Sequence, residues 1–183
     1  MAVFKSFMAV RPTDDNAHKV AALPYDVMNS QEAREMVEGK PYSFLHVDKA
    51  EVDLDKSIDL YDKRVYEKAS SNLYKMIEDG VLVEDDKPCF YIYRQIMDGR
   101  SQTGIVACSS IDDYVNNVIK KHEKTREDKE IDRINHVDTC SAQTGPIFLA
   151  YRSNAIINQI VEKTKKETPL YGFTAVDGVT HNV

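Results

Sequence analysis

The feature that most limits the fold is a pair of strand-like runs joined through an Asp-Gly turn. Residues 89–97 and 101–111 are rich in β-branched and aromatic side chains, a composition that favours strands. Asp98 and Gly99 lie between the two runs, and Asp-Gly in this position is a strong hairpin signal. The sequence therefore predicts an antiparallel ribbon around which a sheet is built.

Further strands and helices alternate along the chain. A second hairpin is predicted where residues 170–176 and 179–183 flank Asp177-Gly178. Other strands are predicted at residues 4–12, 42–47 and 146–151. Helices are predicted at residues 30–39, 62–79, from 112, from 131 to 140 or 142, and from Ser153. The longest helix carries an apolar stripe formed by Val65, Ala69, Leu73, Met76 and Ile77.

This order of elements indicates the α+β class, with a mixed, largely antiparallel sheet and helices packed on it. A chain of 183 residues has the size of one domain, and we expect a single domain over 1–183. The apolar fraction of 42% beside 30% charged residues is typical of a chain that folds.

Composition also narrows the classes of function. A window of apolar residues long enough to span a membrane does not occur, nor does a secretory leader pattern, so we expect a cytoplasmic protein. The net charge of -6 argues against broad nucleic-acid binding. Three cysteines without CxxC spacing suggest neither a disulfide framework nor a metal site, and Cys108 and Cys140 are expected to be buried thiols.

The least generic stretch is the charged run at residues 119–133. Lys120, Lys121, His122, Glu123, Lys124, Thr125 and Arg126 follow one another, and Arg133 closes the run. Cations neutralise phosphate oxygens, and Glu123 could accept a proton or help to hold magnesium. These residue types suit phosphoryl transfer. The alternative is a solvated charged loop, which is the commoner outcome for such a run.

A second candidate lies in the extended segment Pro24-Tyr25-Asp26-Val27. Proline fixes the backbone there, so that Asp26 could meet a substrate amine or a lysine of the charged run. A plain turn is the commoner alternative. His122 and His136 lie fourteen residues apart without H-E-x-x-H spacing, so a zinc site is not expected. His46, at the end of a predicted strand, could be a functional residue, but a partly exposed, hydrogen-bonded histidine is the commoner outcome.

Several separate segments carry a family resemblance. They are AALPYDVMNSQEAR, PYSFLHV, VYEKA, the YIYRQ to QTGIVA hairpin, IKKHEKTREDKEIDR and GPIFLAY. Together they resemble the prokaryotic family catalogued as domain of unknown function 1015. The match spans nearly the whole chain, and its most specific part is the H-E-x-T core at His122 to Thr125.

The resemblance implies a relationship to ParB and sulfiredoxin-like proteins, which bind nucleotide phosphates. Members of the family are usually longer than this chain, so we expect an N-terminal portion of a larger architecture. The phosphate-cradling Asp-Gly-His-His-Arg motif of the family is not present in these residues. A related branch phosphorylates free serine, which implies a small-molecule kinase that uses ATP or ADP with magnesium when full length.

By that analogy, Glu123 with His122 would be catalytic, and Lys121, Thr125, Arg126 and Arg133 would steer phosphate. Tyr25 and Asp26 would hold the substrate. The expected partners are a small-molecule substrate or a nucleotide, with no membrane and no nucleic acid, and an oligomer is left open. Two alternatives stay open: a ParB-like nucleotide-gated regulatory module, and a non-catalytic interaction domain.

Overall fold

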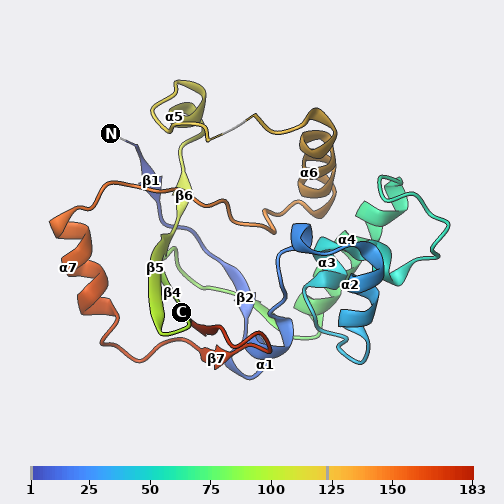
Figure 1. Ribbon diagram of the computed structural model, residues 1–183, viewed down its shortest axis with the longest axis horizontal. Helices are drawn as coiled ribbons and strands as arrows, with labels where there is room; N and C mark the ends of the chain where they lie inside the picture. The colour runs from blue at the N-terminus through green and yellow to red at the C-terminus, as the bar shows by residue number, and fades with distance from the viewer. Residues whose placement is uncertain (1, 123) are drawn as a thin grey trace. The chain divides into compact units, whose positions relative to one another are not determined.

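The computed structural model describes residues 2–122 and 124–183. Contacts divide the chain into two compact units. The first unit comprises Met1–His18, Glu84–Glu123 and Phe148–Val183, and the second comprises Lys19–Val83 and Lys124–Ile147. Helices and antiparallel strands are both present (Figure 1), so the predicted α+β class is confirmed.

Helices and strands alternate along the chain. The helices are α1 (Asp14–Val20), α2 (Ser30–Val37), α3 (Leu45–Asp48), α4 (Lys63–Glu78), α5 (Ile111–Val115), α6 (Glu127–Cys140) and α7 (Ala155–Thr164), with the 3₁₀ turns η1 (Tyr25–Val27) and η2 (Ala50–Asp53). The strands are β1 (Phe4–Lys5), β2 (Val10–Pro12), β3 (Leu82–Glu84), β4 (Tyr91–Met97), β5 (Arg100–Val106), β6 (Cys108–Ser109), β7 (Gly172–Thr174) and β8 (Thr180–Asn182). Among the described residues, no helix is long and apolar enough to cross a membrane.

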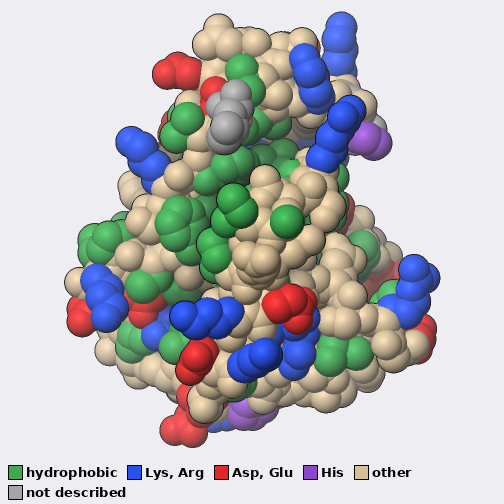
Figure 2. All heavy atoms as spheres, turned by 90° about the vertical axis from the view of Figure 1, so that its left-hand side faces the viewer, with side chains coloured by type: hydrophobic (Ala, Val, Ile, Leu, Met, Phe, Trp, Pro, Cys, Tyr) green, Lys and Arg blue, Asp and Glu red, His purple; other side chains and the backbone are tan. Residues whose placement is uncertain are grey.

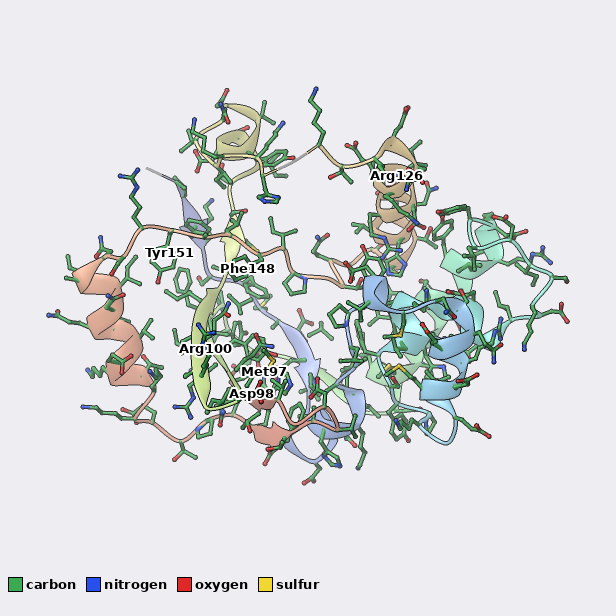
Figure 3. All side chains as sticks on the ribbon, viewed as in Figure 1. Met97, Asp98, Arg100, Arg126, Phe148 and Tyr151 are labelled. Atoms are coloured by element: carbon green, nitrogen blue, oxygen red, sulfur yellow. The ribbon has the colours of Figure 1, made fainter. Side chains whose placement is uncertain are left out.

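The first unit contains both predicted hairpins. Its four-stranded antiparallel sheet has the order β5-β4-β8-β7. Asp98 and Gly99 both have positive φ, 50° and 75°, as a two-residue hairpin turn requires. Figure 3 shows this turn between Met97 and Arg100. The Asp-Gly signals therefore located the sheet correctly, because a two-residue turn leaves the flanking strands only one way to pair.

Two predictions outside the hairpins are wrong. Residues 146–151 are irregular instead of a buried strand (Figure 3). Phe148 and Tyr151 are 79% and 56% exposed. The run pairs with none of the strands in the described sheet, and an apolar run forms a strand only where a neighbour satisfies its backbone. Cys108 is exposed instead of buried.

Helix α7 forms where it was predicted, with Asn154 as its N-cap. Its apolar stripe is only partly covered, because Val161 is buried whereas Ile156 and Ile160 are 69% and 57% exposed. Figure 2 views the molecule from the side on which α7 is drawn in Figure 1, and it shows hydrophobic side chains gathered there. The first unit therefore exposes apolar surface that its own described elements do not cover.

The second unit is helical and holds the main hydrophobic core. The predicted stripe of α4 is confirmed, since Val65, Ala69, Leu73 and Met76 are buried. They pack with Val47 and other residues of one cluster, and α4 contacts α3, η2 and α6. Asp62 caps the start of α4 through its bond from the Arg64 amide, and Gly80 follows its end with φ 70°, which suits glycine.

The predicted strand at residues 42–47 is wrong, because this segment contains the helical turn α3. Leu45 and Val47 are both buried, but they belong to two different clusters, Leu45 with Ala33 and Val37, and Val47 with Leu73. Residues two apart share a face in a strand but point in different directions in a helix. The helical turn therefore lets one short apolar run contribute to two clusters.

His46 connects α3 to the segments before and after it through hydrogen bonds of its side chain. Its Nδ1 lies 2.9 Å from Asp53 Oδ1, and its Nε2 lies 3.2 Å from the Lys40 carbonyl oxygen. Asn72 donates to both the His46 carbonyl and Asp53 Oδ2, at 2.6 and 2.8 Å. The hydrogen bond to Asp53 raises the pKa of His46 against the opposite effect of burial. Since both ring nitrogens face acceptors, the geometry favours the doubly protonated imidazolium.

We expect His46→Gln to destabilise the protein by about 1–3 kcal/mol at pH 6, because charge-assisted hydrogen bonds are lost. A raised histidine pKa gives stability that is full below the ordinary value of 6.5 and is lost as the pH rises through the folded pKa. The difference between wild type and variant should therefore shrink by pH 9 in urea unfolding. A difference of the same size at both pH values would contradict this role, and Lys40→Ala serves as the control, because it keeps the carbonyl.

Candidate functional site

Helix α6 brings unexpected polar residues into the core of the second unit. Arg133, His136 and Cys140 are three and four residues apart, so that they lie on one face of the helix. His136 and Cys140 are only 3% and 1% exposed. Figure 1 shows α6 beside α3 and α4, and α6 contacts α4 directly. The apolar Ile131 and Ile134 are instead about half exposed, at 50% and 52%.

Asp48, at the end of α3, faces this buried histidine. His136 Nε2 lies 3.2 Å from Thr144 Oγ1 and 4.0 Å from Asp48 Oδ1. Asp48 Oδ1 is buried and has no hydrogen-bond partner among the described residues. A buried carboxylate oxygen without a donor is costly, and such groups gather at functional sites.

Burial sets the protonation of both groups. Burial raises the pKa of Asp48 to about 6, although a side-chain hydrogen bond with Thr144 and the positive charge of Arg133 lower this pKa. Burial, together with Arg133, lowers the pKa of His136 to about 4. At neutral pH His136 is therefore neutral, and its approach to Asp48 is not an ion pair. Asp48 is poised to gain or lose a proton near physiological pH.

Arg133 is held at the edge of the same cluster. Its guanidinium carbon lies 4.4 Å from the centre of the Tyr25 ring, a cation–π geometry. Its Nη2 also donates to Asp132 Oδ2 at 2.9 Å, and Tyr66 donates to the other oxygen of Asp132 at 3.0 Å. Stacking and pairing together fix the plane of a half-buried guanidinium, as recognition of carboxylate or phosphate requires.

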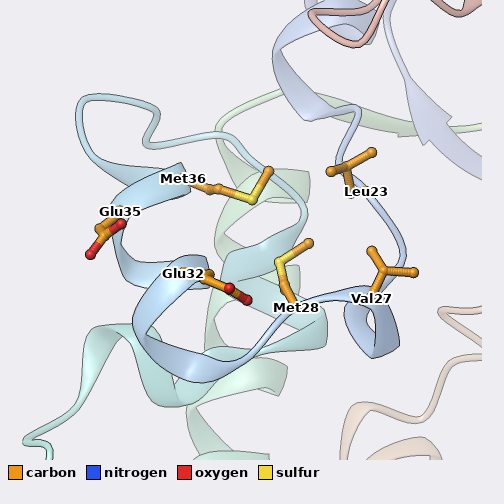
Figure 4. Close-up of a pocket in the computed structure, with 6 residues that line it drawn as sticks. All are labelled: Leu23, Val27, Met28, Glu32, Glu35 and Met36. Carbon is orange, nitrogen blue, oxygen red and sulfur yellow. The ribbon is translucent and has the colours of Figure 1, made fainter.

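A shallow pocket lies beside the turn η1 that carries Tyr25 and Asp26 (Figure 4). Its volume is about 430 Å³, and it is lined by Leu23, Val27, Met28, Met36, Glu32 and Glu35. Glu32 accepts from the Asn29 amide in a capping box, and Glu35 accepts from Gln31. Apolar walls with two carboxylates suit an apolar or amine-bearing group and not a phosphate.

The structure brings together some of the sequence-predicted site residues. Tyr25 and Arg133 are in contact, and Asp26 lies on the same turn as Tyr25 with an exposed side chain. Thr125 and Arg126 are exposed at the start of α6, where Arg126 pairs with Asp128 at 2.8 Å.

The remaining predicted residues belong to the first unit or are not described. Lys121 lies over the Tyr114 ring at 4.4 Å. His122 is exposed, and it has no hydrogen bond or ion pair with a described residue. Glu123 lies outside the described residues. Catalytic roles for His122 and Glu123 stay predictions.

Asp48 and Thr144 were not predicted as site residues, and His136 was considered only as a metal ligand and discounted. The segment holding Asp48 was interpreted as a strand, and Thr144 follows α6 in an irregular segment. One signal was present, because His136 and Cys140 are four residues apart in the segment that was predicted to be a helix, and this spacing places them on one helix face.

Comparison with known proteins identifies the family. The family model described as a protein of unknown function (DUF1015) matches residues 4–183. The chain belongs to this family. No curated protein matches the chain, and no solved structure matches it. The predicted family is therefore confirmed over essentially the whole chain, and the buried Asp48–His136 cluster lies within the matched region.

Within this DUF1015 chain, Asp48 should make stability depend on pH. A carboxyl group with a raised folded pKa gives stability that is full below its ordinary pKa of 3.8 and is lost as the pH rises through about 6. We therefore expect Asp48→Asn to gain about 2–3 kcal/mol relative to wild type between pH 4 and pH 7.5. Urea unfolding at both pH values measures this gain, with the exposed Asp138→Asn on α6 as the control. An unchanged difference would refute a raised pKa.

Proposed function

We propose that this chain forms part of a nucleotide-dependent phosphotransferase that acts on a small hydroxyl-bearing substrate such as serine. The observation that carries the proposal is the buried Asp48 carboxyl, whose pKa of about 6 is matched to proton transfer at neutral pH. The relationship to ParB-like proteins that the family resemblance implies, with its serine-phosphorylating branch, is consistent with the same reaction class. A phosphate-cradling segment would lie outside these residues.

The second unit supports distinct roles for its own residues. Asp48 would accept the proton of the substrate hydroxyl as its oxygen attacks the terminal phosphorus of ATP or ADP, and ADP or AMP would leave. Arg133, fixed against Tyr25, would bind a phosphate or substrate carboxylate oxygen. Asp26 and the carboxylates of the neighbouring pocket would attract a substrate amine. Magnesium with the nucleotide would neutralise charge on the phosphates.

Asp48 therefore takes the role of base for which the sequence suggested Glu123. The two assignments can be separated by experiment, because Glu123→Gln and Asp48→Asn each remove one carboxylate with little change of shape. Loss of a general base lowers turnover by about 10²–10⁴-fold. The variant that loses turnover but keeps nucleotide affinity identifies the base.

The test is calorimetric and thermal-shift titration with ATP, ADP, magnesium and serine. It uses this chain and the longer family protein that the resemblance implies. A specific ligand raises the melting temperature by mass action, and we expect the longer protein to respond and to phosphorylate serine. Asp48→Asn should lower turnover by about 10²–10⁴-fold and retain nucleotide binding, whereas Asp138→Asn should leave both unchanged. If neither protein responds to any nucleotide, the phosphotransferase proposal fails.

One observation favours a second candidate, a non-catalytic interaction domain. The first unit exposes Phe148, Ile156 and Ile160 at 79%, 69% and 57%, and exposed apolar patches mark interaction sites. His122 is also solvent-exposed, as expected for a charged surface loop. Failure of both titrations above, with a folded protein, would favour this candidate.

A further inference from the structure

A row of polar side chains crosses the sheet of the first unit. The register places Arg94 of β4 opposite Asn182 of β8, and Asn182 opposite Gly172 of β7. Directly opposite residues of antiparallel strands share one face of the sheet. A guanidinium and a carboxamide therefore stand side by side on this face, next to a residue without a side chain.

The two side chains offer donors without acceptors. Asn182 Nδ2 is buried and lacks a hydrogen-bond partner within the described part of the chain. The side chain of Arg94 is half-buried and makes no hydrogen bond or ion pair with any described residue. Buried donors are almost always paired in proteins, and a buried arginine ordinarily meets an anion. The row therefore has the chemistry of an anion site.

The lack of a side chain at Gly172 makes room for the Asn182 amide. A Cβ atom at this position would lie only 2.9 Å from Asn182 Oδ1, which is closer than real contacts allow. The backbone of Gly172 does not need glycine for a positive φ. The absence of a side chain here consequently matters for the position of Asn182 and not for the turn.

Arg94 and Asn182 open into a pocket of about 400 Å³ that lies wholly within the first unit. Its walls include the apolar side chains of Phe90, Ile92 and Leu170. A volume of this size fits a small organic molecule. An apolar wall beside polar donors indicates a ligand with both an apolar body and a charged group.

The other charged groups of the pocket are largely paired or exposed. Arg11 binds Asp85 at 2.8 Å, and Tyr91 donates a hydrogen bond to the same carboxylate. Lys165 pairs with Glu162 at 2.7 Å. The remaining charged side chains of the lining, those of Lys87, Asp86 and Glu167, are exposed, and their charges sum to one negative charge. Arg94 is thus the half-buried lining cation without a described partner.

We infer that this pocket binds a small organic anion, a carboxylate or phosphate carried on a flat apolar body. Arg94 and Asn182 hold the anionic oxygens, and the body packs against Phe90 and Leu170. The site shares no residue with the Asp48 cluster, so this inference and the proposed function stand or fall separately.

Calorimetry with four matched probes tests the inference on the full chain. Phenyl phosphate and phenylacetate carry both the body and the anion, inorganic phosphate carries only the anion, and 2-phenylethanol carries only the body. We expect at least one of the first two to bind more tightly than both single-feature probes. Which of the two binds better distinguishes phosphate from carboxylate recognition.

Variants locate the binding. Arg94→Ala and Asn182→Ala should each weaken the preferred probe about tenfold or more, because a charge-assisted or buried hydrogen bond is lost. Gly172→Ala should weaken it as well, by displacing the Asn182 amide. Arg100→Ala, on the neighbouring strand and outside the pocket lining, is the matched control and should bind as wild type does.

A second measurement on the wild type does not depend on whether the variants fold. Amide and guanidinium nitrogen chemical shifts of Asn182 and Arg94 in wild type should move on titration, independently of any variant. The inference is overturned if no probe binds at millimolar concentration, if inorganic phosphate binds as tightly as the aromatic anions, or if folded Arg94→Ala binds like wild type.

Discussion

The packing of α4 is the constraint on which the second unit depends. Its stripe of Ala69, Leu73 and Met76 joins Val47 of α3 and Cys140 of α6 in one apolar cluster. Burying this surface drives folding, and it fixes which face of each neighbouring helix points inward. His136 is carried into the core because it lies one turn from Cys140, and Asp48 because it follows Val47. The polar site is therefore a consequence of the apolar packing around it.

Burial then gives these polar groups their chemistry. The same low-polarity surroundings that stabilise Leu73 disfavour charge on both Asp48 and His136, so that the pKa of the acid rises and that of the imidazole falls. A solvated aspartate would be fully ionised at neutral pH and a poor proton shuttle. The polar side chains of the first unit are positioned in a different way, because strand register, and not helix packing, places Arg94 opposite Asn182.

Sequence patterns correctly predicted the elements whose backbone conformation depends on residues close to one another in the chain. Asp98-Gly99 specified a hairpin through backbone geometry alone, and the spacing of Val65 to Met76 specified α4 through helical periodicity. Prediction was wrong for residues 42–47 and 146–151, where a short apolar run suits either a strand or a helix. Whether such a run becomes a strand depends on a pairing partner elsewhere in the chain. Tyr25 and Arg133 were both predicted as site residues, but their stacking was not.

The sequence by itself determined the family, the α+β class, both hairpins and the amphipathic helices, because each rests on contacts between residues close in the chain or on an ordered set of motifs. Only the tertiary structure decided that Asp48, His136 and Thr144 meet, and that Arg94 and Asn182 lie side by side on one sheet face. The widest of these separations, between Asp48 and Thr144, is 96 positions. Their proximity and burial arise from packing and strand register, which local patterns do not encode.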